Sequence, residues 1–284
     1  VSVLFSQRSL KRGSDLLLAL DIGTEVVKAL IFRVDPVEKK GIIVGVGKVP
    51  QKVGNMQSGA VSDISGVIGS SREAIALAKE RAGVKRVEKS IIGIAGELVK
   101  GTTTTVHYER VNPEMHIGIP ELKMIIQKVQ EKAYERIRRQ LAWETGQDDI
   151  DVKLINAAVV DVRIDGYHVQ NPVDFQGRDV SMSVFNAYAP MIHLGALQTI
   201  ADELDLDLLS IAAEPYAVAR SIEVDDMLDF SAIFIDIGGG TTDIAVVRNG
   251  GLEGTKMFAL GGRAFTKRLA QEFGVSFDVA EQMK

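Results

Sequence analysis

Two short runs place an aspartate and one or more glycines directly after an apolar segment, at residues 21–24 and 236–243. Glycine adopts positive φ at little cost and lets a ligand approach the backbone closely. Consecutive backbone amides in such a turn form a concavity that binds anions. We therefore predict that both turns hold the phosphates of a nucleotide. The predicted phosphate-binding residues are Gly23, Gly238, Gly239 and Gly240, together with the hydroxyl-bearing Thr24, Thr241 and Thr242.

The aspartates of the two turns have a different predicted role. Asp21 and Asp236 repel phosphate because the charges have the same sign, so we expect each to hold Mg²⁺ through its water shell. The alternative is that each aspartate–glycine pair only closes a hairpin, as many do without binding anything. That alternative is weaker for the longer run at 236–243. The sequence has neither a P-loop nor a Gly-x-Gly-x-x-Gly motif after its first strand.

The elements that must position the first turn are visible as apolar runs. Strands are predicted at 16–20, 26–32 and 42–47, and their short connections indicate an antiparallel sheet. A helix follows, in which apolar residues recur at helical spacing. Ser62 is its predicted N-cap and Gly83 its predicted end.

The same order of elements returns around the second turn. Strands are predicted at 230–235, 244–248 and 252–259, followed by a break at Gly261 and Gly262 and a helix over 264–273. Strand, aspartate–glycine turn, strand, strand and helix therefore occur twice. A repeat at this separation predicts two similar lobes that face one another.

A block of different pattern lies between the repeats. Strands are predicted at 91–95, 102–108, 154–163 and 180–187, and Pro120 begins a long amphipathic helix that reaches about Leu141. We expect this block to be a small α+β subdomain. The predicted division is a mobile leader at 1–14, a first subdomain at 15–87, the inserted subdomain at 88–188 and a second lobe at 189–284.

These residues resemble the motifs of the actin-like ATPase superfamily. The run 21–24 is similar to its first phosphate motif, 236–243 to its second, and Ala-Glu-Pro-Tyr-Ala at 213–217 to its connecting motif. The resemblance implies an α/β fold of the actin-like, ribonuclease-H-like type that binds ATP and Mg²⁺. It also implies that Glu214 polarises the attacking water and that Gly261 and Gly262 belong to the nucleotide site. A glutamate at a strand-to-helix junction suits a general base, although it can also simply cap the helix.

The position of the inserted block resembles FtsA, the bacterial protein that tethers FtsZ filaments to the membrane, as do the stretches 45–47, 90–96 and 171–173. The resemblance implies divisome partners such as FtsZ, self-association into filaments, and a cytoplasmic, peripheral location at the inner face of the cell membrane. PilM, the actin-like component of type IV pilus assembly, is the alternative, because residues 214–220 look more like PilM. Pilus assembly proteins would then be the partners. A chaperone would need a peptide-binding domain after the ATPase.

Three hypotheses for activity stay open. The chain is a polymerising adaptor with ATP as a structural ligand, a genuine ATPase whose hydrolysis drives a cycle, or an interaction module in which residues 88–188 recruit the partner and nucleotide is irrelevant. We expect ATP binding with at most slow hydrolysis. FtsA proteins continue past this point with a subdomain that closes the nucleotide site. We therefore expect a truncated second lobe, weak ATP affinity for these residues, and membrane contact that is indirect or made through a further segment.

Composition argues against several other classes of function. The net charge of −5 over 284 residues provides no basic footprint for nucleic acid. The absence of cysteine excludes disulfides and thiolate metal sites, and the four histidines lack metal-ligand spacing. No apolar run approaches the ~20 residues of a membrane span. The leader carries Arg8, Lys11 and Arg12, which give only a weak attraction to anionic lipid.

Overall fold

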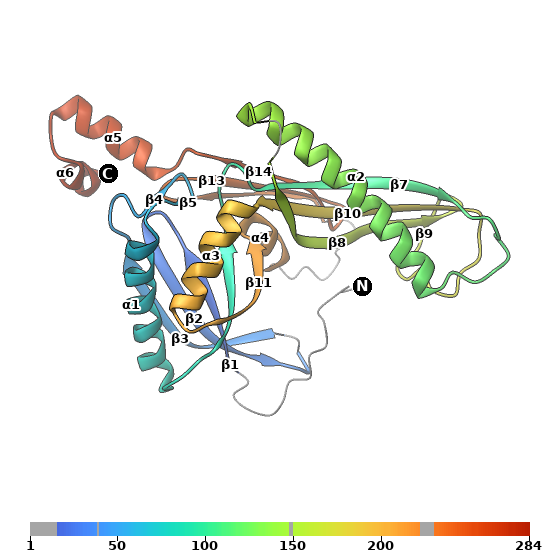
Figure 1. Cartoon of the computed structure of the whole chain (residues 1–284), viewed down its shortest axis with the longest axis horizontal. Coiled ribbons are helices and arrows are strands. Elements are labelled where there is room, and N and C mark those ends of the chain that lie inside the picture. The colour runs from blue at the N-terminus through green and yellow to red at the C-terminus, as the bar shows by residue number, and fades with distance from the viewer. Residues whose placement is uncertain (1–15, 39, 148–149, 222–229) are drawn as a thin grey trace.

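The computed structural model describes residues 16–38, 40–147, 150–221 and 230–284. The predicted leader at 1–14 lies outside these residues. Two large β-sheets form the body of the molecule, and helices α5 (Gly262–Phe273) and α6 (Phe277–Met283) project at one end (Figure 1). In that view helix α1 (Ile64–Ala82) lies at the left, and the inserted block with helix α2 (Ile119–Thr145) extends to the right. Within the described residues, no helix is long and apolar enough to cross a membrane.

The first lobe is built on a five-stranded sheet with the order β11-β6-β1-β2-β3. Its strands are β1 (Leu16–Ile22), β2 (Val26–Asp35), β3 (Lys40–Pro50), β6 (Lys89–Ile94) and β11 (Asp207–Ala213). The first three form an antiparallel meander, as predicted, and β6 and β11 extend it in parallel. Leu18, Leu20 and Ile22 of β1 are buried on one face. Because side chains alternate along a strand, Asp21 projects from the opposite face.

Helix α1 packs on β2 and β3, and glycines set how closely it approaches. A Cβ added at Gly47 would lie 1.8 Å from the carbonyl oxygen of Ala74, and one at Gly45 would lie 2.2 Å from the carbonyl oxygen of Ala78. A side chain at either position would push the helix off the sheet. Glycine is therefore needed in the run 45–47 for packing rather than for a special φ.

The ends of α1 test two predictions. Gly83 ends the helix in the left-handed conformation, as predicted. The predicted N-cap, Ser62, is wrong by one residue. Asp63 has the extended backbone that precedes the first helical turn, and its carboxylate accepts a hydrogen bond of 3.1 Å from the backbone N–H of Gly66. Both residue types cap helices well, so only the backbone conformation selects between them.

The second sheet has seven strands in the order β12-β13-β14-β7-β10-β8-β9. Its strands are β7 (Lys100–Glu109), β8 (Val152–Ile164), β9 (Tyr167–His168), β10 (Asp179–Pro190), β12 (Ala232–Ile237), β13 (Thr242–Arg248) and β14 (Gly251–Phe258). The antiparallel meander β12–β13–β14 repeats the arrangement of β1–β2–β3. Strand β14 pairs with β7 of the inserted block through Gly254 with Thr102 and Thr255 with Gly101. The block therefore continues the sheet of the second lobe. The strand predicted at 91–95 as part of this block lies instead in the first sheet as β6, where it pairs in parallel with β1. The domain limits stay predictions.

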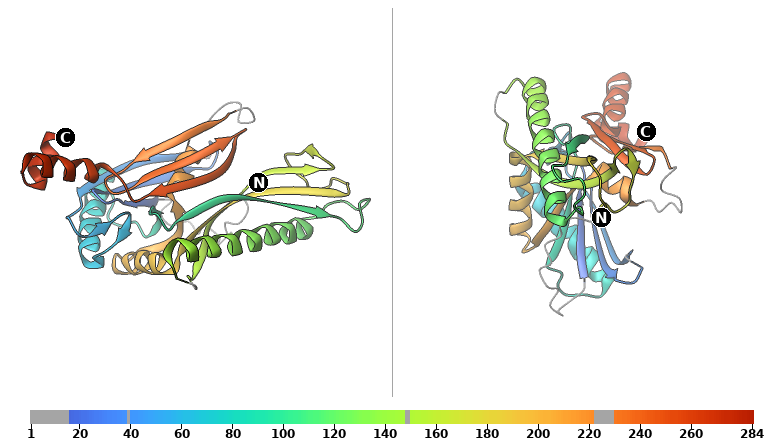
Figure 2. Two further views of the ribbon diagram at one scale, coloured as in Figure 1. Left: turned by 90° about the horizontal axis from the view of Figure 1, so that it is seen from above. Right: turned by 90° about the vertical axis from the view of Figure 1, so that its right-hand side faces the viewer.

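The inserted block has a core of its own under α2. Ile125 and Val129 of this helix pack with Val180, Met182 and Val184 of β10. Figure 2 shows α2 lying along the extended strands of the block, away from the first lobe. The helix predicted from Pro120 is confirmed, and it continues to Thr145 before Gly146 ends it.

The remaining described elements are short. They are helices α3 (Met191–Glu203), α4 (Glu214–Ser221), α5 (Gly262–Phe273) and α6 (Phe277–Met283), with strands β4 (Met56–Gln57) and β5 (Ala60–Val61). Helix α4 follows β11 without a loop, and α5 with α6 lies at the end of the molecule opposite the inserted block (Figure 1). Elements β4, β5, β9 and α6 were not predicted, because runs of two to seven residues carry too little periodicity.

Candidate functional site

The two glycine turns, far apart in the sequence, touch one another. A Cβ added at Gly240 would lie 2.6 Å from the hydroxyl oxygen of Thr24, and one at Gly239 would lie 2.2 Å from Cγ of Glu25. Thr24 is buried by this contact. Residue 23 must be glycine because of contacts within its own turn, where an added Cβ would lie 2.8 Å from the carbonyl oxygen of Val26. The fold thus places the first turn directly against the second.

The second turn is also joined to the start of α5. The backbone N–H of Gly262 donates to the carbonyl oxygen of Gly238 at 2.8 Å, and a Cβ added at Gly261 would lie 2.6 Å from that oxygen. Thr242 donates its hydroxyl to the carbonyl oxygen of Leu260 at 2.7 Å. Gly261 and Gly262 therefore lie at the turn where the sequence analysis grouped them.

The two aspartates occupy equivalent places in their hairpins but face different partners. Asp21 lies opposite Lys28 across β1 and β2, and Asp236 lies opposite Asp243 across β12 and β13. The Lys28 ammonium forms a 2.7 Å ion pair with Asp21, and this bond raises the pKa of Lys28. In the second hairpin, burial and the neighbouring charge of Asp236 raise the pKa of Asp243 to about 6. Oδ1 of Asp243 is buried without a hydrogen-bond partner.

Glu214 has a carboxyl group that is buried within reach of the charges of both turns. As the first residue of α4 it stands at the end of β11, next to Gly93 of β6, where an added Cβ would lie 3.1 Å from its Oε1. Burial, together with the charges of Asp21 and Asp243, raises the pKa of Glu214 to about 8. The carboxylates of both turns therefore act on this one side chain.

The inserted block fixes the position of Glu214. The ring of Tyr216 stacks on Phe185 of β10 with centroids 5.6 Å apart and planes 3° from parallel. Asn156 of β8 accepts a hydrogen bond of 2.8 Å from the backbone N–H of Ala213. These contacts hold the strand-to-helix junction from the side of the second sheet, and a rigid junction is what an acid or base near a cleft requires.

The acidic residues do not form a direct metal cage. Among the described residues, no group of three or more His, Asp or Glu side chains lies close enough to hold a metal ion. The charges of Asp21, Asp243 and Asp236 instead act on the buried carboxyl of Glu214 and help to raise its pKa. Oδ1 of Asp243 is a buried hydrogen-bond acceptor that no donor among the described residues reaches. This donor set fits a hydrated divalent cation held through water, the way Mg²⁺ is kept beside nucleotide phosphates.

Five residues around the turns were not predicted as site residues: Glu25, Lys28, Gly93, Asp243 and Arg263. Asp243 lies within the recognised run 236–243, so the sequence did hold a signal for it. Lys28 could have been found from strand pairing, since it is the residue opposite Asp21. Nothing in the spacing of Gly93 and Arg263 points to the turns, because only the tertiary fold brings them there.

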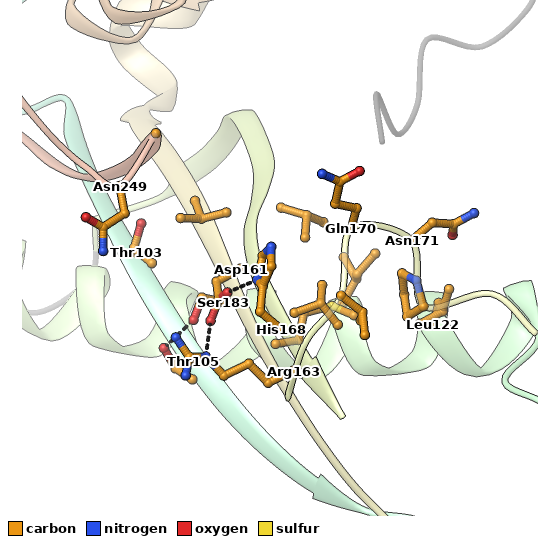
Figure 3. Close-up of a pocket in the computed structure, with 18 of the residues that line it drawn as sticks. Thr103, Thr105, Leu122, Asp161, Arg163, His168, Gln170, Asn171, Ser183 and Asn249 are labelled. Atoms are coloured by element: carbon orange, nitrogen blue, oxygen red, sulfur yellow. Dashed lines mark hydrogen bonds and ion pairs between the residues drawn. The ribbon is translucent and has the colours of Figure 1, made fainter. Parts of the chain in front are cut away.

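A pocket of about 910 Å³ lies away from the glycine turns, between the inserted block and the tip of the β13–β14 hairpin (Figure 3). Asp161 is central in its polar wall, held by Arg163 at 2.9 Å and by His168 at 2.8 Å. Thr105 and Ser183 share a hydrogen bond of 2.8 Å beside them. The Asp161 carboxylate is thus paired with Arg163 and His168, and the two hydroxyls are paired with each other.

Known proteins of one family are similar to this chain. Residues 233–284 match the family model of "Cell division protein FtsA". The chain is 29% identical to FtsA of Neisseria meningitidis serogroup B over 93% of its own length and 59% of that protein. It is 25% identical to FtsA of Bacillus subtilis over 96% of its own length and 58% of that protein. The chain is similar to FtsA. The resemblance stated from the motifs is thereby confirmed.

A solved structure supports the fold independently of this FtsA similarity. A chain of the "PilM-PilN type IV pilus biogenesis complex" superposes with a TM-score of 0.65 at 17% identity, over 94% of this chain and 68% of that one. The predicted actin-like α/β fold is confirmed. The chain spans slightly less than two thirds of the length of the FtsA proteins named above. FtsA similarity thus covers both lobes and the inserted block as described.

Proposed function

We propose that this chain is an FtsA-like protein that binds Mg²⁺-ATP between its two glycine turns. The observation that carries the proposal is the contact of the turns, in which Gly240 lies against Thr24. The carboxylates of both turns also act on the buried carboxyl of Glu214. Apposed turns present backbone amides from both lobes to one anion. A triphosphate is the ligand class that suits such a double concavity beside carboxylates able to hold hydrated Mg²⁺.

Each group has a role in this proposal. The amides at Gly23, Gly239 and Gly240, with the hydroxyl of Thr24, hold phosphate oxygens. Gly238, Thr241 and Thr242 instead shape the second turn, because the N–H of Gly238 donates to the carbonyl oxygen of Thr241 at 2.9 Å and both hydroxyls already donate within the protein. Gly261 and Gly262 keep the second turn in place. Lys28 brings a positive charge to the first turn. Mg²⁺, when bound, neutralises the phosphates and is held through water by Asp21 and Asp236. Glu214 orients a water molecule, and we expect at most slow hydrolysis.

Nucleotide binding is tested by titrating Mg²⁺-ATP into the chain and into Asp21→Ala/Asp236→Ala. We expect weak binding, on the order of 10 μM or weaker, that falls at least tenfold in the double variant, about 1.4 kcal/mol. Glu253→Gln is the matched control, since this carboxylate is exposed at the far end of β14, 3.1 Å from Arg248. Equal binding by all three proteins would refute a phosphate site at the turns.

In the cell, we propose that the protein acts as a polymerising adaptor of the divisome, which recruits FtsZ at the inner face of the cell membrane. Similarity to FtsA of Neisseria meningitidis and Bacillus subtilis supports it. Co-sedimentation with FtsZ filaments separates the three hypotheses for activity. An adaptor needs ATP but not hydrolysis for binding. An ATPase shows turnover that vanishes in Glu214→Ala. An interaction module binds equally well after Asp236→Ala.

A second candidate function is a PilM-like role in type IV pilus assembly. The superposition on a chain of the PilM–PilN complex, with its TM-score of 0.65, favours it. The two candidates differ in partner, so binding to an FtsZ tail peptide and to a PilN peptide is compared directly. Preferential binding of the PilN peptide would replace the divisome role while leaving the nucleotide site unchanged.

A further inference from the structure

Glu25 follows directly after the first turn and reaches across to the second. Its methylene stem rests on Gly239, where an added Cβ would lie 2.2 Å from Cγ of Glu25. Its carboxylate forms an ion pair with the guanidinium of Arg263, the second residue of α5. A carboxylate therefore lies over one of the glycines whose amides are the proposed phosphate ligands.

Arg263 joins both turns. Its Nη2 donates to the carbonyl oxygen of Thr24 at 2.9 Å, while its backbone N–H donates to the carbonyl oxygen of Gly239 at 2.9 Å. Only 14% of its side chain is exposed, against 37% for Glu25. The guanidinium is thus fixed inside the contact between the lobes, and the carboxylate is the more accessible and more easily displaced member of the pair.

A guanidinium in this position can bind a phosphate as well as a carboxylate. Arg binds both groups through the same fork of N–H donors. A negative charge on Glu25 also repels a phosphate held at the neighbouring turn. The Lys28 ammonium is engaged by Asp21 at 2.7 Å, in the first turn, whereas the Arg263 guanidinium is paired with Glu25, whose stem lies against Gly239 of the second turn.

We propose that Glu25 and Arg263 form a clasp across the cleft, in which Arg263 exchanges the Glu25 carboxylate for a phosphate of the bound nucleotide. Glu25 then acts as an internal competitor that lowers the affinity for nucleoside polyphosphates, and Arg263 acts as a phosphate ligand. This inference rests on the proposed nucleotide site. It adds a determinant of affinity that none of the predicted motif residues provides.

The test compares Mg²⁺-ATP binding to the chain, to Glu25→Gln and to Arg263→Gln by calorimetry. Glu25→Gln keeps the length and the packing on Gly239 but removes the charge, so we expect about tenfold tighter binding. Arg263→Gln should weaken binding by about tenfold, and adding it to Glu25→Gln should abolish the gain. Glu253→Gln is again the control, because it removes one carboxylate from an ion pair outside the cleft. Unchanged or weaker binding by Glu25→Gln overturns the clasp.

A second measurement needs no nucleotide. Urea unfolding of the two single variants and their double variant forms a cycle that reports the direct coupling of the two side chains. We expect each single variant to lower the unfolding midpoint and the double variant to lie no lower than the worse single one. Additive shifts overturn the clasp. If the cycle shows coupling but no variant binds ATP, the proposed nucleotide site fails, and phosphate exchange by Arg263 fails with it.

Discussion

At the scale of single residues, the most informative group is Glu214. Its pKa of about 8 means that the folded protein holds a proton that a glutamate with the ordinary pKa of 4.5 would release. Burial is the first cause, and the carboxylates of Asp21 and Asp243 add to it. A cation placed in the cleft would reverse this effect, so the same crowding that disfavours the charged form also prepares the cleft for a cation.

Glu214→Gln should therefore stabilise the protein in a pH-dependent way. The folded pKa lies above the unfolded one, so between pH 4.5 and 8 the folded state binds more protons and wild-type stability falls as pH rises. Glutamine does not titrate. We expect equal melting temperatures near pH 4.5 and a Glu214→Gln variant that is more stable at pH 8 by about 1 kcal/mol or more.

Thermal melts of both proteins from pH 4.5 to 8.5, without Mg²⁺ or nucleotide, provide the measurement. Asp243 titrates in both proteins, so its contribution largely cancels in the difference. A difference in melting temperature that stays constant across this range would mean that the Glu214 carboxyl keeps its ordinary pKa, and the argument from burial would then be wrong.

At the scale of elements, the approach of α1 to β3 depends on glycines rather than on matching side chains. The carbonyl oxygens of Ala74 and Ala78 lie where the Cβ atoms of residues 47 and 45 would be. The meander β1–β2–β3 is thus pressed against one helix, and this packing holds the first turn rigid. The equivalent meander β12–β13–β14 is held instead by β7 of the inserted block and by α4.

Gly47→Ala should be strongly destabilising, because the new methyl group would lie 1.8 Å from the Ala74 carbonyl oxygen and backbone cannot yield easily. We expect a loss of about 1–3 kcal/mol, the usual cost of overpacking. Gly69→Ala is the matched control within α1, since an added Cβ there meets nothing within 4 Å. That control should be neutral or stabilising by up to about 1 kcal/mol, because alanine favours helix. Urea denaturation measures both. Equal effects would contradict the close contact.

At the scale of the whole molecule, the inserted block is joined to the second lobe by one short pairing. β7 and β14 meet at Gly101 with Thr255 and Thr102 with Gly254. The stacked rings of Phe185 and Tyr216 add a second link, which leads to Glu214. The hydrogen bond from Ala213 to Asn156 of β8 is a further link. Because these links lie on the neighbouring strands β7, β10 and β8, the block and the second turn should behave as one cooperative unit.

Gly101→Ala should break that unit. A Cβ at Gly101 would lie 2.3 Å from the Thr255 hydroxyl oxygen and 2.7 Å from the Phe185 ring, so β7 would be forced away from β14. The opposite change, Gly254→Ala, is the control, because its nearest contact is an ordinary 3.5 Å. We expect Gly101→Ala to melt earlier and in two steps, with limited proteolysis cutting between block and lobe first, while Gly254→Ala melts as the wild type does. A single unshifted transition for Gly101→Ala would show that the link is not needed.

The sequence by itself determined the local parts of this protein. The two turns, the strands beside them and the long helix from Pro120 follow from glycine chemistry and from periodicity, both of which act within a few residues. The repeated pattern also predicted two lobes, and the motif residues predicted the resemblance to FtsA. The tertiary structure decided which residues meet across long separations: Thr24 with Gly240, Glu25 with Arg263, and Gly93 with Glu214. It also decided the pKa of Glu214, because burial and the charges of other strands exist only once the sheets are assembled.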